Sequence, residues 1–248
     1  MHGRIRNRLA FLFILLANTQ TTAAACVDPT QLARSAVSIM RHFDDAEREA
    51  RPDLIGIRGT GSFLSPTTIL SAEHVTAAMK LSTEDWKPLE IVNDDGSQFI
   101  DARIQRLAGS RADKLAVIEL QRPVSNAQSV AIRTEPLVPD EQVMALAYPA
   151  GRPQLVGGRF VRIEDDDSKL AGMALLELYE GENRLIIDHG ASGAPVVDCA
   201  GRVAAVVSFV FTQTIAGFSR PIRVSTAWGM PNVVSVPAST LEDSLQTH

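Results

Sequence analysis

Residues 189–198 read HGASGAPVVD, and in this stretch a loop of small residues, Gly190 to Gly193, leads into a short apolar run typical of a β-strand. A serine hydroxyl becomes nucleophilic only when a base removes its proton, and the tetrahedral intermediate that follows needs N–H donors aimed at its oxyanion. Gly190 stands two residues before Ser192, where a glycine lets the backbone turn its N–H toward that oxyanion. We therefore predict that Ser192 is a nucleophile and that the N–H groups of Gly190 and Ser192 form an oxyanion hole.

Two segments upstream supply partners for that serine. Residues 61–75 read GSFLSPTTILSAEHV, which predicts two strands joined by a Ser-Pro turn, with His74 at the end of the second. Histidine is the usual general base near neutral pH. Residues 111–120 read RADKLAVIEL and place Asp113 just before an apolar strand. The order His74, Asp113, Ser192, with spacings of 39 and 79 residues, is that of the chymotrypsin arrangement and not of subtilisin or the α/β-hydrolases.

On these residues the chain resembles the trypsin-like (chymotrypsin-fold) serine peptidases, in particular secreted bacterial members and the protease domain of HtrA-like proteins without a PDZ module. The resemblance covers roughly residues 54–236 and rests on SAEHV, DKLAVIEL, LAYPAG, and HGASGAPVVD followed by GRVAAVVSF. It implies that His74 is the general base, Asp113 the carboxylate that orients it, and Ser192 the nucleophile. Such an enzyme hydrolyses peptide bonds through an acyl-enzyme and needs no cofactor.

The resemblance also implies how a polypeptide substrate is bound. Ser208, Phe209 and Val210 correspond to the edge strand that pairs with an extended substrate, a mode known as β-augmentation. Ile186 corresponds to the floor of the pocket that binds the substrate residue before the cleaved bond. We therefore expect this substrate residue to be small or medium-sized and apolar. His189, beside the oxyanion loop, is expected to lie on the rim and contact substrate.

Two positions depart from the family pattern. Lys114 stands directly before the strand, where family members have aspartate, so Asp113 lies one residue early. A loop or bulge before the strand can absorb such an offset, and the next acid upstream, Asp101, is expected to be too far away. Ala191 replaces the polar residue that usually precedes the nucleophile. These departures leave a second interpretation open, that of a catalytically inactive pseudoprotease of the same fold that binds peptides.

Outside these motifs the sequence predicts an all-β fold of two antiparallel six-stranded β-barrels with an N-terminal helix. Asp28-Pro29 is a favourable helix start, and apolar residues at helical spacing extend the expected helix to about residue 48. We expect the helix and a linker over residues 26–52, the first barrel over 53–134, the second over 135–240, and a tail over 241–248.

Short apolar runs bounded by Gly, Pro, Asn and Asp indicate the strands of these barrels. The expected strands are residues 54–57, 61–64, 68–71, 90–92, 102–107 and 115–120 in the first barrel, and 143–147, 155–163, 173–178, 185–187, 194–197, 203–210 and 224–228 in the second, the last one extended by 233–236.

The first 25 residues read as a signal peptide. Three arginines within the first eight residues precede an apolar run over residues 9–17, which is too short to span a bilayer, and Ala23-Ala24-Ala25 supplies an A-x-A cleavage site. We therefore expect a periplasmic or secreted protein. No other apolar run reaches membrane-spanning length, so no membrane span is expected.

The cysteines and the net charge indicate which covalent links and binding partners to expect. Cys26 and Cys199 are the two cysteines, and in an exported chain they predict one disulfide; the alternative is a lipid anchor at Cys26. Without the leader, the basic residues fall from 24 to 21 against 29 acidic ones, and the formal net charge falls from -5 to -8. A net negative charge does not favour binding to the phosphates of nucleic acids, so no nucleic-acid partner is expected. No metal site is expected either, because Glu73-His74 lacks the second histidine of an H-E-x-x-H motif.

Overall fold

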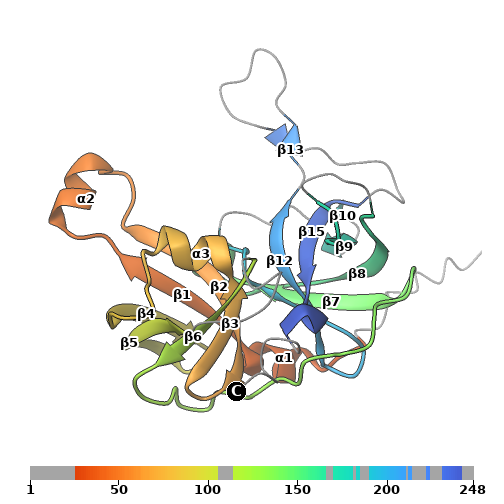
Figure 1. The fold of residues 1–248 in the computed structure, drawn as a ribbon, viewed down its shortest axis with the longest axis horizontal. Helices are drawn as coiled ribbons and strands as arrows, with labels where there is room; N and C mark the ends of the chain where they lie inside the picture. Colours follow the sequence, from red (N-terminus) through yellow and green to blue (C-terminus); the bar gives the residue numbers. More distant parts are fainter. Residues whose placement is uncertain are drawn as a thin grey trace, which may run out of the picture.

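A computed structural model describes residues 26–105, 114–165, 170–180, 183–184, 190–210, 212–213, 222–223 and 231–241. Within this part of the chain, two antiparallel β-barrels lie side by side, the N-terminal one built by the red-to-green segment and the C-terminal one by the green-to-blue segment (Figure 1). The fold is therefore the predicted one, two six-stranded barrels with few helices.

The first barrel closes in the strand order β1-β2-β3-β6-β5-β4. Its interior is filled by aliphatic side chains and by Phe63, which is fully buried. Its strands and the helices around them are α1 Pro29–Ser35, β1 Ala36–His42, α2 Asp45–Ala50, β2 Gly56–Ser65, β3 Thr68–Ala72, α3 Glu73–Ala78, β4 Lys87–Asn93, β5 Gly96–Gln105 and β6 Leu115–Leu120.

The second barrel has the order β9-β15-β12-β11-β7-β8, and β8 pairs back with β9 to close it. β10 pairs with the last two residues of β9, Tyr179 and Glu180. Its elements are β7 Gln142–Ala147, η1 Pro149–Gly151, β8 Gln154–Ile163, β9 Ala174–Glu180, β10 Asn183–Arg184, β11 Pro195–Val197, β12 Val203–Val210, β15 Val233–Pro237 and η2 Ala238–Leu241; the short β13 Thr212–Gln213 and β14 Ile222–Arg223 pair with each other.

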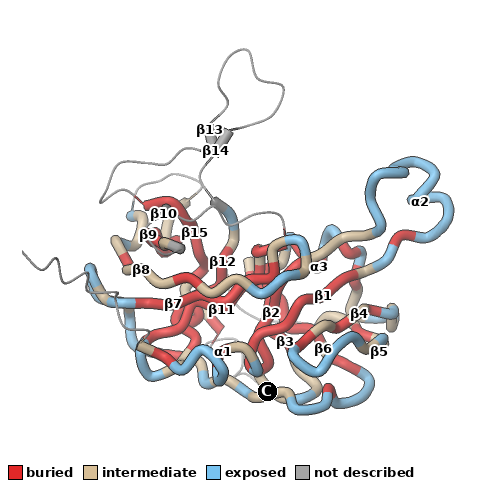
Figure 2. Tube along the Cα trace, turned by 180° about the vertical axis from the view of Figure 1, so that it is seen from behind, coloured by how far each residue is buried: buried red, intermediate tan, exposed pale blue. Residues whose placement is uncertain are grey.

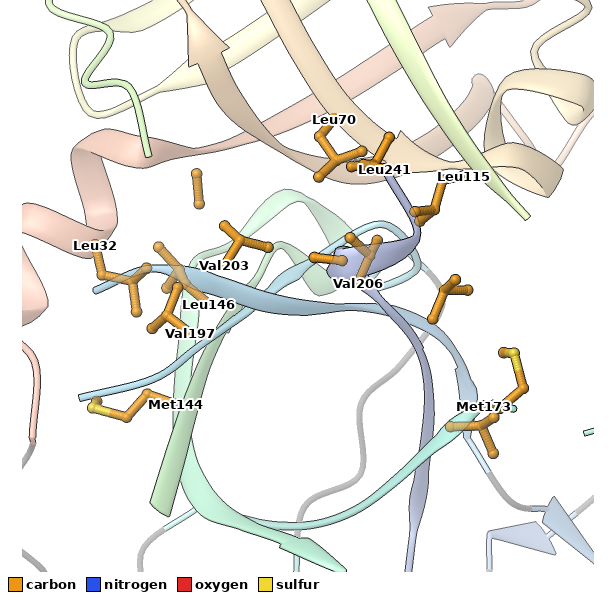
Figure 3. Packing of buried hydrophobic residues seen from close by; sticks show 14 of the residues in the cluster. Leu32, Leu70, Leu115, Met144, Leu146, Met173, Val197, Val203, Val206 and Leu241 are labelled. Atoms are coloured by element: carbon orange, nitrogen blue, oxygen red, sulfur yellow. The ribbon is translucent and has the colours of Figure 1, made fainter. Parts of the chain in front are cut away.

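A shared apolar cluster joins the barrels. Leu70 and Leu115 of the first barrel meet Val206 of the second and Leu241 of η2 (Figure 3). Burying such aliphatic side chains contributes about 1.5–3 kcal/mol each relative to exposure. The cluster therefore fixes the relative position of the barrels, which any site assembled from both of them requires.

The predicted N-terminal helix is wrong over most of its length. Its start is confirmed, because the Asp28 carboxylate accepts a hydrogen bond from the Thr30 N–H at 2.9 Å, but α1 ends at Ser35 and the chain continues as strand β1. The strand pairs with both β2 and β4, so the first barrel begins at Ala36, before the expected boundary at residue 53. The barrel interior covers one face of β1 and the second barrel covers the other, so its first five residues are all buried. A continuous buried run carries no period-2 signal that would separate strand from helix.

Two expected strands of the first barrel are one. Residues 54–57 and 61–64 were separate in the prediction, whereas β2 runs unbroken from Gly56 to Ser65 and leaves Leu54 and Ile55 exposed before it. The segment between β1 and β2 stands away from the barrel, and it exposes most of its residues to solvent, including those of α2, although Phe43 at its start is buried (Figure 2). The expected strands at 185–187 and 224–228, and the signal peptide at 1–25, lie outside the described residues.

Cys26 and Cys199 form a disulfide, as predicted. The bond ties the segment before α1 to the turn between β11 and β12, and Leu32 of α1 packs into the shared cluster (Figure 3). Among the helices that the structure describes, none combines the length and the apolar character needed to cross a bilayer.

Candidate active site

The loop that carries Ser192 is held in an unusual backbone conformation. Gly190 and Gly193 both have positive φ, +100° and +88°, which side chains other than hydrogen rarely permit. The Gly193 N–H donates to the Val207 carbonyl at 2.8 Å, and the Ala194 N–H closes a tight turn by donating to the Ala191 carbonyl at 3.0 Å. A Cβ at Gly193 would collide with the Thr60 carbonyl. The two glycines therefore permit both the turn and its close approach to the first barrel.

Thr60 of β2 connects the first barrel to this loop. Its N–H donates to the Ser192 carbonyl at 2.9 Å and its hydroxyl donates to the Gly190 carbonyl at 2.6 Å. The same hydroxyl accepts from the Tyr148 N–H at 3.0 Å, and the Ser71 hydroxyl donates to the Thr60 carbonyl at 2.7 Å. Thr60 is fully buried, so each of these hydrogen bonds is sheltered from water. They fix both ends of the residue 190–192 segment.

His74 lies in the first turn of α3, next to the same strand. A Cβ at Gly59 would collide with Val75 and would come within 3.4 Å of the Ser192 carbonyl oxygen, so Gly59 lies between the residue after His74 and the serine loop. The side chain of His74 remains accessible to solvent. Desolvation of its ring nevertheless lowers the pKa of His74 below its usual 6.5, and the charge of Glu73 opposes that shift. A neutral imidazole is the form that can accept a proton.

The hydroxyl of Ser192 is directed to the second barrel. It donates to the Ser208 carbonyl of β12 at 3.0 Å, and no hydrogen bond joins it to His74 among the described residues. The structure thus brings the segments of the predicted nucleophile and base together around Gly59 without making the hydrogen bond between them.

Asp113 lies outside the described residues, but its neighbour in the chain does not. The β3–β6 ladder ends with Ala72 opposite Leu115, and the Glu73 N–H extends it by donating to the Lys114 carbonyl at 3.1 Å. The residue after Asp113 therefore pairs with the residue before His74.

The predicted substrate strand is partly described. The β11–β12 ladder ends where Pro195 pairs with Val206, while β12 continues to Val210 along β15. Ser208 is half-buried and Phe209 is 42% exposed, and the register with β15 shifts between Val207 and Phe209. The side chain of Val210, and the whole of Ile186 and His189, are outside the described residues.

Thr60 was missing from the predicted site. Its side-chain partners stand 88 and 130 residues away in the sequence, and a threonine between two glycines carries no local signal for that role. In the described part of the chain, no three His, Cys, Asp or Glu side chains cluster in a way that could hold a metal ion.

Comparison with solved structures supports the fold. The active form of the Rv3671c protease of M. tuberculosis is similar with a TM-score of 0.59 and 16% sequence identity, over 88% of this chain and 82% of that one. Its inactive form is similar with a TM-score of 0.56 and 16% identity, over 88% of this chain and 90% of that one. No curated protein gives a significant sequence match. The model of the trypsin-like peptidase domain matches residues 59–206, more than half of the chain and the segment from Gly59 through Ser192 to β12. The chain therefore belongs to the trypsin-like peptidase domain family.

Proposed function

We propose that this protein is a serine endopeptidase that cleaves polypeptides through an acyl-enzyme, with Ser192 as nucleophile and His74 as general base. The observation that carries the proposal is the position of Gly59-Thr60. This dipeptide contacts Val75, next to the base, and holds the Ser192 carbonyl by a 2.9 Å hydrogen bond. Strand β2 of the first barrel thus lies against both the segment that carries His74 and the loop that carries Ser192, and these two belong to different barrels.

The reaction follows from these positions. His74 takes the Ser192 hydroxyl proton while Oγ attacks the substrate carbonyl carbon, and the N–H groups of Gly190 and Ser192 bind the oxyanion. The imidazolium then returns the proton to the leaving amine as the C–N bond breaks. Water, deprotonated by His74 in its turn, hydrolyses the ester and restores the serine. The first step requires the Ser192 hydroxyl to rotate from the Ser208 carbonyl toward His74.

Asp113 is proposed to orient His74, and the β3–β6 register supports this role. The ladder itself stops at Ala72 and Leu115 because α3 begins at Glu73, but the Glu73 N–H still donates to the Lys114 carbonyl at 3.1 Å, so the residue before His74 is hydrogen-bonded to the residue after Asp113. This hydrogen bond supports the proposal that Asp113 acts on His74 in spite of the one-residue offset caused by Lys114.

Substrate is proposed to pair with β12 beyond Val207, whose N–H and carbonyl still bond to Ala194 and Gly193 after the ladder with β11 has ended. Ser208, Phe209 and Val210 would supply the backbone groups of that pairing. We retain the preference for a small or medium apolar residue before the cleaved bond, with Ile186 at the floor of its pocket and His189 at its rim.

Export is proposed from the leader at residues 1–25 and the disulfide. Disulfides form and persist in oxidising compartments such as the bacterial periplasm. The disulfide occupies the Cys26 sulfur, which supports a protein without a lipid anchor at that residue. Intact mass of protein recovered from a periplasmic or culture fraction tests this: we expect a chain that begins at Cys26 and carries no acyl groups.

Covalent labelling with a fluorophosphonate probe tests the catalytic proposal. We expect stoichiometric labelling of the wild type at Ser192, located by peptide mapping, and none in Ser192→Ala. His74→Ala should label slowly, because its serine has no base. Thermal unfolding of all three proteins serves as the control for folding.

The second candidate function is a peptide-binding protein without catalysis. The hydrogen bond of the Ser192 hydroxyl to the Ser208 carbonyl favours it, since this hydroxyl is not directed to a base. A folded wild type that stays unlabelled would favour this candidate over the peptidase.

A further inference from the structure

Arg58 places a cation beside the serine loop. It lies two residues before Thr60 on β2, and alternate residues of a strand share a face, so both side chains are directed to the second barrel. The Cδ of Arg58 is 3.7 Å from the position that a Cβ would occupy at Gly190. The cation therefore lies next to a proposed donor of the oxyanion hole.

The guanidinium rests against Gly151 of η1. Gly151 has a φ of +78°, and a Cβ on that residue would collide with Nη1 of Arg58. On its other side, Nη2 donates to the thioether of buried Met40 at 3.0 Å, which is a weak acceptor. Met40 is the cross-strand partner of Arg58 on β1. Gly151 of the second barrel and Met40 of the first thus hold the Arg58 guanidinium between them.

Arg58 has no carboxylate partner among the described residues. Most other arginines with described contacts are paired, as Arg41 is with Glu47 and Arg159 with Glu177. The hydrogen bond from Ser97 is the main cause that lowers the pKa of Glu90, a hydrogen bond with His42 adds to it, and the charge of Arg58 contributes least, so this carboxylate is already engaged. Guanidinium donors therefore remain for a ligand, and the side chain is only partly buried.

The position of Arg58 indicates which part of a bound substrate lies near it, the part before the cleaved bond or the part after it. β12 contacts the serine loop from one end, through the Gly193 N–H and the Ser192 hydroxyl. Gly190, at the other end of the loop, faces Arg58. A substrate whose residues before the cleaved bond pair with β12 would continue past Gly190, so the residues after that bond reach Arg58.

We propose that Arg58 binds a carboxylate on the leaving-group side, so that the enzyme prefers substrates with Asp or Glu at the first or second position after the cleaved bond. This inference rests on the proposed peptidase function. A planar guanidinium fits a carboxylate with two parallel hydrogen bonds. The chain has a formal net charge of -5, so its surface as a whole does not attract acidic peptides and the preference is local to Arg58.

Cleavage of a mixed peptide library, with the products sequenced by mass spectrometry, tests the inference. Wild type should enrich Asp and Glu at the first two positions after the cut by about three- to tenfold, and raised ionic strength should weaken the effect. Arg58→Gln should abolish the enrichment, and Arg58→Glu should favour Lys and Arg instead. Gly151→Ala, which keeps the charge but displaces the guanidinium, should weaken it.

Arg51→Gln is the matched control, because Arg51 is an exposed arginine that lies over Phe43, apart from the serine loop; it should cleave like wild type. Cleavage that depends on Ser192 but shows no acidic preference, or an equal preference in Arg58→Gln, would overturn the role of Arg58 and leave the peptidase proposal intact. If the wild type shows no cleavage that the Ser192→Ala substitution abolishes, both the peptidase proposal and the role of Arg58 are overturned.

Discussion

The hydroxyl of Thr60, in the first barrel, donates a 2.6 Å hydrogen bond to the carbonyl of Gly190, in the second. The same oxygen accepts from the Tyr148 N–H at 3.0 Å, so one buried hydroxyl joins two loops of the second barrel to one strand of the first. The N–H that we propose for the oxyanion hole belongs to the same residue, Gly190, whose carbonyl is held here. The orientation of that peptide segment thus depends on a contact between barrels.

Thr60→Val should impair acylation more than substrate binding. Valine has a similar shape but leaves the Gly190 carbonyl and the Tyr148 N–H without their partner, and the loop is expected to shift. Misplacement of a catalytic group by about 1 Å costs up to about 10²-fold in rate. We expect kcat to fall by about 10- to 100-fold with KM little changed, measured by steady-state hydrolysis. Thr60→Ser keeps the hydroxyl and should retain most of the activity; equal losses in both variants would refute this role.

Gly59→Ala should disturb the proposed base and the proposed nucleophile together. A methyl group at this position would collide with Val75 and approach the Ser192 carbonyl, so α3 or the serine loop must move. We expect fluorophosphonate labelling to slow by at least about tenfold. Gly157→Ala on β8, where a Cβ meets nothing within 4 Å, is the control and should label at the wild-type rate. Normal labelling of Gly59→Ala would show that the two segments are not coupled through this residue.

The rate of labelling should depend on the protonation of His74. Desolvation lowers the pKa of this residue, and only the neutral ring accepts the serine proton. The rate is therefore expected to rise with pH and to reach half its maximum below pH 6.5. Glu73→Gln should move that midpoint to still lower pH, because the Glu73 charge raises the pKa. A wild-type midpoint above 6.5 would mean that a carboxylate acts on the ring more strongly than desolvation does.

Asp113→Asn should reduce turnover by about 10⁴-fold if Asp113 orients His74, by analogy with the same change in a related triad. The amide cannot hold the histidine in the tautomer that accepts the serine proton. Asp101→Asn, the other acid upstream of the strand, is the control and should leave kcat unchanged. A loss below tenfold in Asp113→Asn would point to another orienting group.

Cys199→Ser should lower the free energy of unfolding by about 2–4 kcal/mol, because the disulfide closes a loop across 173 residues of sequence and restricts the unfolded chain. Urea denaturation of the oxidised wild type and the variant measures the difference. Adding a reducing agent should bring the wild type to the midpoint of the variant. If the oxidised wild type and Cys199→Ser had the same urea midpoint, the disulfide would have no stabilising role.

The sequence alone determined the features that depend on local chemistry. The small residues from Gly190 to Gly193 marked a tight loop, and most runs between Gly, Pro and Asn breakers became strands, because turns and strand propensity act over a few residues. The order of His74, Asp113 and Ser192 indicated the family, and two cysteines in a chain with an expected leader predicted the disulfide.

Tertiary structure decided what depends on partners distant in the chain. Residues 36–42 read equally well as a helix, and they form β1 because β2 and β4 offer hydrogen bonds while the two barrels bury both of its faces. Thr60 and Arg58 carry no local signal, since the groups they contact come from the other barrel or from β1. The direction of the Ser192 hydroxyl was likewise set by a carbonyl of β12, because a hydroxyl rotor turns to whichever acceptor the packed fold brings within reach.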